Sequence, residues 1–263
     1  MPTPFAAAAA LLIGLLLGML GGGGSVLTVP VLVYLLGVPA KAAVAMSMPI
    51  VGLTSLVGAA GHWRHGAVAW RPALAFGGVA MGAAYAGARL AQGLDARVQL
   101  GLLGALMAAT SVSMLWPRRA AASDPAGASG VAAPEAPGAA AGRAWPLAAA
   151  GVGVLTGVVG IGGGFLVVPA LVLLARVPMR QAIGTSLVVI TLNAASGLAG
   201  HLGRTPIAWG TVAWFSALAI VGILVGTRLS RQLPTTWLRQ GFAWLLLAIA
   251  ALMLWQQGRP VAG

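Results

Sequence analysis

Acidic residues are almost absent from this chain of 263 residues, and charge of either sign is scarce. Only 7% of the residues are charged, and the three acids are Asp95, Asp124 and Glu135. Because a soluble domain carries about 25% charged residues, this composition excludes an ordinary soluble domain. So few carboxylates exclude paired-carboxylate catalysis and argue equally against a carboxylate-lined cation or metal site. The chain also lacks cysteine, which excludes disulfides, thiolate chemistry and cysteine-based metal sites.

Apolar residues and glycine make up most of what is present. The chain is 59% hydrophobic and contains 39 glycines, a residue more frequent in transmembrane helices than in soluble ones. Its net charge is +12, but the basic residues lie between apolar runs. We therefore expect them to meet lipid headgroups and to set the topology, and we expect no nucleic-acid partner. The composition predicts an all-α polytopic membrane protein with no cofactor and no metal, and it leaves the oligomeric state open.

The chain contains two copies of one unit. When the sequence is shifted by 139 residues, 34 of the 103 positions from Gly14 to Trp116 are identical. Rare residues coincide, since His62 aligns with His201 and Trp70 aligns with Trp209. The residues between the copies are rich in proline, alanine and glycine and show no periodicity, which is typical of a disordered linker. The predicted organisation is a transmembrane repeat at 1–116, a disordered linker at 117–143 and a second transmembrane repeat at 144–257.

Each repeat is predicted to hold one glycine-broken helix element followed by three transmembrane helices. In the first repeat the five apolar pieces are Phe5–Leu20, Val26–Leu36, Ala42–Gly61, Pro72–Leu90 and Val98–Trp116. The last three are long enough to cross about 30 Å of hydrocarbon. The first two flank a run of four glycines, which disfavours a regular helix.

The orientation of the repeats follows from how the broken element lies in the membrane. If it crosses once, the repeats are parallel and the 15 basic residues divide 8 to 7. If it enters and returns to the same face, the repeats are inverted and the division is 10 to 5. The five residues on the poorer face are then Lys41, Arg89, Arg97, Arg204 and Arg259. The positive-inside rule favours the inverted arrangement, with both termini outside.

The two glycine clusters are the strongest functional signal. Helix breaks at matching positions of two repeats indicate a transporter site, and the N-termini of half-helices offer N–H groups that suit an anion. Close helix packing is the alternative use of glycine. Hydroxyl and amide side chains early in the following helix are candidates for further contacts, with helix capping as their alternative. The candidate substrate-binding residues are Gly23, Gly24, Ser25, Ser47, Gly162, Gly163, Gly164, Thr185, Ser186 and Asn193.

Histidines end the same helix in both repeats. His62 and His201 are candidates for proton coupling, because no buried carboxylate is at hand. The alternative is an interfacial side chain that anchors a loop, and the neighbouring Arg64 and Arg204 favour that reading.

The motifs resemble those of the sulfite exporter TauE/SafE family. The residues that carry the likeness are Gly-Ile-Gly-Gly-Gly-Phe-Leu-Val-Val-Pro at 160–169, Val-Pro at 177–178, Ala-Ile-Gly-Thr-Ser at 182–186 and Gly-His-Trp-Arg-His-Gly at 61–66. The likeness covers nearly everything except the linker. It implies a multi-pass protein of the bacterial inner membrane that transports sulfite, a sulfonate or a related small anion. The first repeat departs from the pattern, with Ala45-Met46-Ser47 where the second has Gly184-Thr185-Ser186.

The lead hypothesis is thus a secondary transporter for a small anion and not an enzyme. Two other functions remain open. An accessory or scaffold subunit of a membrane complex would have the same composition. An intramembrane hydrolase would need Ser25 as nucleophile and His62 as base, although the second repeat has Gly164 in place of that serine.

Overall fold

The computed structural model describes residues 4–115, 144–160, 164–173, 177–203, 205–229, 244 and 247–251. The predicted linker at 117–143 and two candidate site residues, Gly162 and Gly163, lie outside the described residues.

The described residues form helices joined by turns and contain no strand. This confirms the predicted all-α class. The first half contains α1 (Pro4–Leu20), η1 (Gly23–Leu27), α2 (Thr28–Pro30), η2 (Val31–Leu35), α3 (Ala40–Trp63), α4 (Trp70–Ala91) and α5 (Ala96–Leu115). The second half contains α6 (Ala144–Val159), α7 (Gly164–Leu173), α8 (Met179–His201) and α9 (Trp209–Leu229). By length and composition, four of these helices can cross a membrane: α3, α4, α8 over Gln181–His201, and α9.

Glycine and proline set the helix boundaries around the two breaks. Helix α1 is followed directly by Gly21, whose φ is +68°, and α6 is followed directly by Gly160, whose φ is +77°. This left-handed conformation ends a helix and favours glycine, because a Cβ would be strained there. Helices α3 and α8 begin directly after Pro39 and Pro178. The breaks predicted from the sequence are therefore present in the chain.

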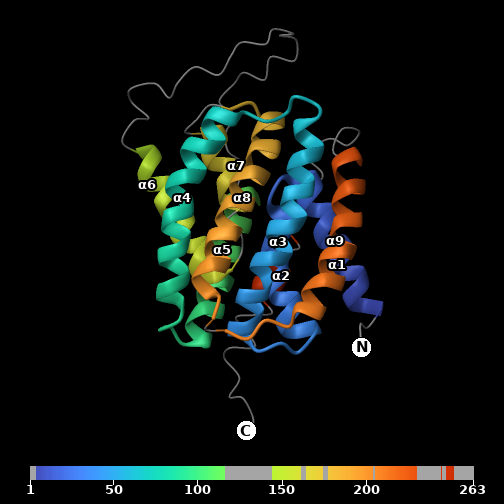
Figure 1. Cartoon of the computed structure of the whole chain (residues 1–263), viewed down its shortest axis with the longest axis vertical. Coiled ribbons are helices and arrows are strands. Elements are labelled where there is room, and N and C mark those ends of the chain that lie inside the picture. The colour runs from blue at the N-terminus through green and yellow to red at the C-terminus, as the bar shows by residue number, and fades with distance from the viewer. Residues whose placement is uncertain are drawn as a thin grey trace.

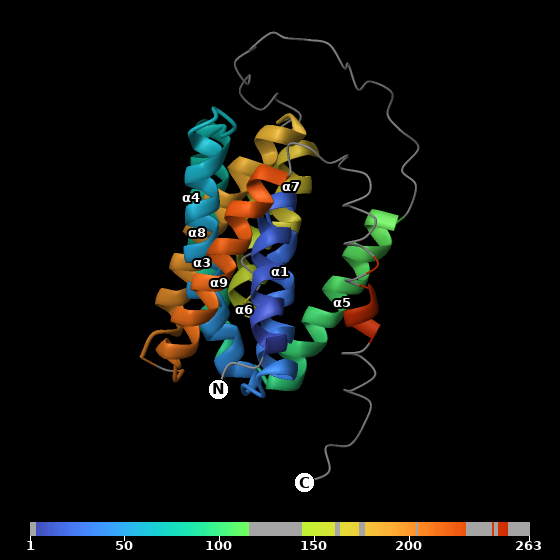
Figure 2. The ribbon, with the colours of Figure 1, turned by 90° about the vertical axis from the view of Figure 1, so that its right-hand side faces the viewer.

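The helices pack across the two halves of the chain. Helix α1 makes its largest contact with α9, α4 makes its largest contact with α6, and α3 crosses α8 between them (Figure 1). Small residues allow the close approach, because a Cβ at Gly153 of α6 would clash with the Ala80 carbonyl of α4. Helix α5 lies on the side of the bundle away from α4 and α8 (Figure 2).

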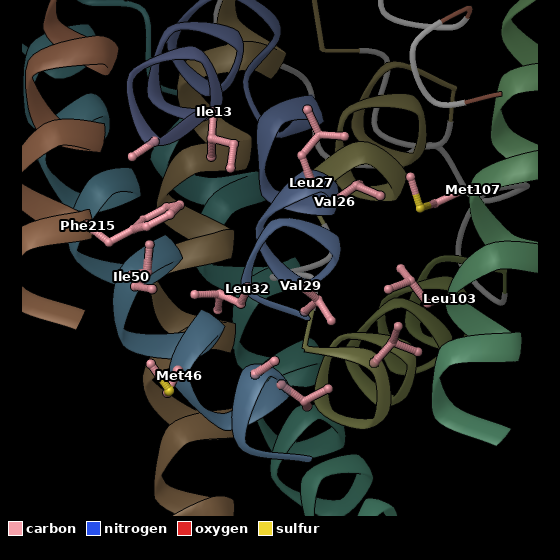
Figure 3. Packing of buried hydrophobic residues seen from close by; sticks show 14 of the residues in the cluster. Ile13, Val26, Leu27, Val29, Leu32, Met46, Ile50, Leu103, Met107 and Phe215 are labelled. Carbon is pink, nitrogen blue, oxygen red and sulfur yellow. The ribbon is translucent and has the colours of Figure 1, made fainter. Parts of the chain in front are cut away.

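The interrupted segment from η1 to η2 is buried in the hydrophobic core. Val26, Val29 and Leu32 are fully buried, and the core around them includes side chains of α1, α3, α5 and α9 (Figure 3). Non-helical backbone at membrane depth is tolerated when protein surrounds it. The core therefore supports the irregular segment that the glycine run introduces.

Candidate substrate site at the two helix breaks

The two glycine breaks meet inside the bundle. Gly22 and Gly164 are both buried, and a Cβ on either residue would clash with the backbone of the other. Element η1 also contacts α7. Two segments that are far apart in the sequence thus bring their irregular backbone together, with α7 beginning at the point of contact.

Each break is tethered to the long helix of the opposite half by a serine. The Ser47 hydroxyl of α3 lies 2.6 Å from the Gly160 carbonyl oxygen and 2.6 Å from the Val44 carbonyl oxygen of its own helix, and it shares its one proton between them. The Ser186 hydroxyl of α8 likewise shares its proton between the Gly21 carbonyl oxygen and the Ile183 carbonyl oxygen of its own helix. The two serines and the two glycines are buried, so each bond between them satisfies a carbonyl that has left its helix. The candidate residues Ser47 and Ser186 therefore lie at the breaks, where their hydroxyl protons are engaged by the protein.

The first glycine cluster is satisfied locally. The Ser25 hydroxyl donates to the Gly22 carbonyl oxygen at 2.7 Å, and the Ser25 N–H donates to the same oxygen at 3.2 Å. A Cβ at Gly24 would clash with the Ile13 carbonyl of α1, so this glycine also serves helix packing. Gly23 begins η1 and is buried. The hydroxyl of Ser25 is thus paired with backbone and not with an imidazole, as a hydrolase would need.

Thr185 links the start of α8 to the loop between α3 and α4. Its hydroxyl oxygen accepts a hydrogen bond from the Ala69 N–H at 2.9 Å. A Cβ at the neighbouring Gly184 would clash with the Ala67 carbonyl oxygen, so the same loop packs closely against α8 at this residue. Thr185 is fully buried. It lies one residue before the tether at Ser186.

Asn193 is the most unusual of the candidate residues. It is fully buried, and neither its Oδ1 nor its Nδ2 has a hydrogen-bond partner among the described residues. It lies seven residues after Ser186 and three after Ile190, which places all three on one face of α8. The Ile190 side chain occupies the space where a Cβ on Gly164 would lie. The unpaired amide therefore shares the helix face that carries the contacts to the breaks.

The sequence did not single out three further polar groups in the bundle. The hydroxyl oxygens of Thr28, Ser55 and Ser216 are buried and have no hydrogen-bond partner in the part of the chain that the structure describes. The signal for them was present, since each is a hydroxyl residue inside a strongly apolar segment. By contrast, the sequence could not indicate that the carbonyl oxygens of Gly21 and Gly160 accept hydrogen bonds from the serines, because every residue has a carbonyl.

The two histidines occupy different surroundings. His201 is 3% exposed, and its Nδ1 lies 2.9 Å from the Gly197 carbonyl oxygen one turn earlier in α8. His62 is half-buried at the end of α3 and packs beside Gly184, close to Thr185. Both lie at helix ends, and His62 is the nearer of the two to the first break, because the start of α8 beside it also packs against Gly21.

The positive side chains that the structure describes lie on the surface of the bundle. Every lysine and arginine side chain that the structure describes is exposed, namely Lys41, Arg64, Arg71, Arg89, Arg97 and Arg228. An anion between the breaks would therefore depend on backbone N–H groups and neutral polar side chains. Two half-helix N-termini and the Asn193 amide are among the groups that the described residues offer.

Comparison with known proteins gives consistent results along the whole chain. The protein family described as "Sulfite exporter TauE/SafE" matches residues 6–253 of this chain. A probable membrane transporter protein of Xylella fastidiosa (strain Temecula1) is 31% identical over 252 residues, covering 93% of this chain and 92% of that protein. The probable membrane transporter protein YdhB of Bacillus subtilis is 27% identical over 243 residues, covering 92% of this chain and 96% of that protein. No solved structure matches the chain.

Proposed function

Because the chain belongs to the sulfite exporter TauE/SafE family of membrane transporters, we propose that it carries a small anion across the bacterial inner membrane. The substrate class that we propose is an oxidised sulfur compound such as sulfite or a sulfonate. Membership of a transporter family implies that the chain is not an enzyme. No ATP-binding motif occurs in the sequence, so the transporter is proposed to be a secondary one.

The observation that carries this proposal is the meeting of the two breaks, beside the face of α8 that also carries an unpaired buried amide. Broken helices at the interface of two repeats are where secondary transporters bind substrates. Here Gly22 touches Gly164, and Asn193 shares a helix face with the contact to Gly164. An anion held there would accept hydrogen bonds from N–H groups at the starts of η1 and α7, each contributing roughly 1.5–3 kcal/mol. Two or three such bonds would give weak binding, which suits rapid release.

We assign two roles to the candidate residues. Backbone around Gly23, Gly24 and Ser25, together with Gly162, Gly163 and Gly164, would contact the anion directly, and Asn193 would add its amide. Ser47, Thr185 and Ser186 would hold the site in shape, because their hydroxyl groups are bonded to backbone from the opposite half of the chain. The hydrogen bonds of Ser47, Thr185 and Ser186 to backbone support this division.

We also propose that the two halves are inverted repeats. Helix α3 runs in the opposite direction to α8, and α4 runs opposite to α9 (Figure 1). These are the helices that the 139-residue shift aligns. Contacts follow the same shift, since Ser47 to Gly160 becomes Ser186 to Gly21 when the halves are exchanged. An inverted pair provides two equivalent states that open to opposite faces of the membrane.

Single cysteines would test the inverted arrangement, and the chain has no cysteine of its own to remove. His65 and Pro206 are exposed residues in the α3–α4 and α8–α9 loops, and these two loops correspond in the two repeats. We expect His65→Cys and Pro206→Cys to react with a membrane-impermeant maleimide from opposite faces of right-side-out vesicles. Reaction of both from one face would establish the parallel arrangement instead.

Flux through the purified chain tests the function itself. Proteoliposomes that contain only this protein should take up radiolabelled sulfite faster than protein-free liposomes. Sulfoacetate, thiosulfate and chloride as competitors would define the substrate class. If no anion moves through the purified protein, while cells that contain it do transport one, the chain is an accessory subunit and the proposal is wrong.

A further inference from the structure

The unpaired amide of Asn193 restricts which kind of anion the site would bind. A buried amide without a hydrogen bond costs several kcal/mol in apolar surroundings. Polar side chains in membrane helices usually bond to a neighbouring helix, but neither polar atom of Asn193 has such a partner among the described residues. A ligand that bonds to both atoms would remove the penalty.

The chemistry of the amide restricts that ligand. Nδ2 donates hydrogen bonds, whereas Oδ1 only accepts them. A fully deprotonated oxyanion has acceptors alone, so it would pair with Nδ2 and leave Oδ1 unsatisfied. An oxyanion that keeps one acidic hydrogen can accept from Nδ2 and donate its O–H to Oδ1. The side chain is thus matched to an oxyanion with one proton still bound.

The charge of the site leads to the same species. The lysine and arginine side chains that the structure describes are all exposed. Because the free energy of moving an ion into a low-dielectric medium rises with the square of its charge, a dianion would be far more costly there than a monoanion. We propose that Asn193 selects the singly protonated, singly charged form of an oxyanion, such as hydrogen sulfite. This inference rests on the proposed function.

The titration must belong to the substrate and not to the protein. The titratable or charged groups on the described helices that pack against α8 lie toward the helix ends. They are Lys41 and His62 on α3, Arg71, Tyr85 and Arg89 on α4, and Arg180 and His201 near the two ends of α8 itself, while α6 and α7 carry none. If one of these groups controlled transport, the pH profile would be the same for every substrate.

The test is initial uptake into proteoliposomes that have equal pH inside and outside. From about pH 6 to about pH 8 the protonated fraction of an acid that titrates near pH 7 falls roughly tenfold, and we expect sulfite uptake at fixed total concentration to fall with it. With selenite, which loses its second proton at higher pH, the fall should move to higher pH. A profile with the same midpoint for both anions, or one that rises with the dianion, would overturn the inference.

Variants on α8 test the residue. Asn193→Thr introduces the side chain that α3 carries at the corresponding position. There the Thr54 hydroxyl donates a hydrogen bond to the Ile50 carbonyl oxygen of its own helix. We expect at least tenfold slower sulfite uptake with an unfolding temperature no lower than that of the parent. Thr191→Val, two residues away, removes a hydroxyl that only bonds within α8 and should transport at the parent rate. Methanesulfonate, a monoanion without an acidic hydrogen, should inhibit at least tenfold more weakly than hydrogen sulfite.

The outcomes separate the two proposals. Parent-like uptake by Asn193→Thr, or equally strong inhibition by methanesulfonate, would overturn the role of Asn193 and leave anion transport in place. Absence of uptake by the parent protein at every pH would overturn the proposed function and this inference together.

Discussion

Helices α3 and α8 each bond through a serine to the break in the other half of the chain, but the hydrogen bonding of their other polar side chains differs. On α3, Thr54 bonds to the Ile50 carbonyl oxygen of its own helix. On α8, the side-chain amide of the corresponding Asn193 has no hydrogen bond within the described residues. Thr185, which corresponds to Met46 on α3, bonds to the loop between α3 and α4. The shared positions hold the fold together, whereas the differing ones are concentrated on α8. These contacts support the proposal that the two halves share an architecture, with most polar side chains of the candidate site on the second half.

The largest expected effect concerns the shared architecture at the breaks. Gly160→Ala places a Cβ in a left-handed conformation, 2.8 Å from the Ser47 hydroxyl oxygen. Backbone strain and overpacking should together destabilise the protein by about 3 kcal/mol or more. Gly203→Ala is the matched control, because Gly203 has φ +76° and open space around it, and strain alone should cost about 1–2 kcal/mol. Membrane yield and unfolding temperature in detergent measure both, and equal losses would mean that the contact with α3 is unimportant.

The two serine tethers test whether the halves are equivalent. Ser47→Ala and Ser186→Ala each leave a buried glycine carbonyl without its donor, at an expected cost of about 1–3 kcal/mol. If the architecture is shared, the two losses in stability should be similar and both variants should transport more slowly. A loss confined to one variant would show that the breaks are held by different means. Urea or thermal unfolding of the two proteins in one detergent gives the comparison.

Thr185 is where the halves differ, and its effect should be smaller. Thr185→Val keeps the shape of the side chain and leaves the Ala69 N–H without its acceptor, which should cost about 1 kcal/mol. We expect slower flux as well, because the loop then loses its hold on α8 next to Ser186. The control is Met46→Leu on α3, a volume-conserving change that should alter neither property much. Parent-like stability and flux in Thr185→Val would remove this residue from the site.

The smallest effect is expected at the two histidines. The double variant His62→Gln/His201→Gln should keep the pH dependence of flux, because both side chains lie at helix ends and serve as anchors. Uptake measured across the pH range near neutrality checks this. A flattened profile in the double variant would instead assign proton coupling to these residues, which is the alternative that their chemistry allows.

Much of the fold could be predicted because its causes are local. The left-handed conformations of Gly21 and Gly160 and the starts after Pro39 and Pro178 follow from the residue types themselves. The partners at the site depend on packing between distant segments. Nothing near Ser47 in the sequence indicates that its hydroxyl bonds to Gly160, which is 113 residues away. Likewise, the lack of a partner at Asn193 depends on every side chain around it. Ser25 illustrates the opposite case, since its satisfied hydroxyl results from a turn of three residues.

The contact of α1 with α9 has a consequence for biogenesis. Helix α1 is the first described element to be synthesised, and its main partner α9 is the last helix whose bounds the structure defines. During translation α1 therefore enters the bilayer long before the surface against which Gly14 and Gly18 pack exists. Until then its small-residue face has no α9 surface to pack against. The native bundle closes only after the second half arrives, so assembly of this protein is an event of the completed chain, even though each half has its own set of helices.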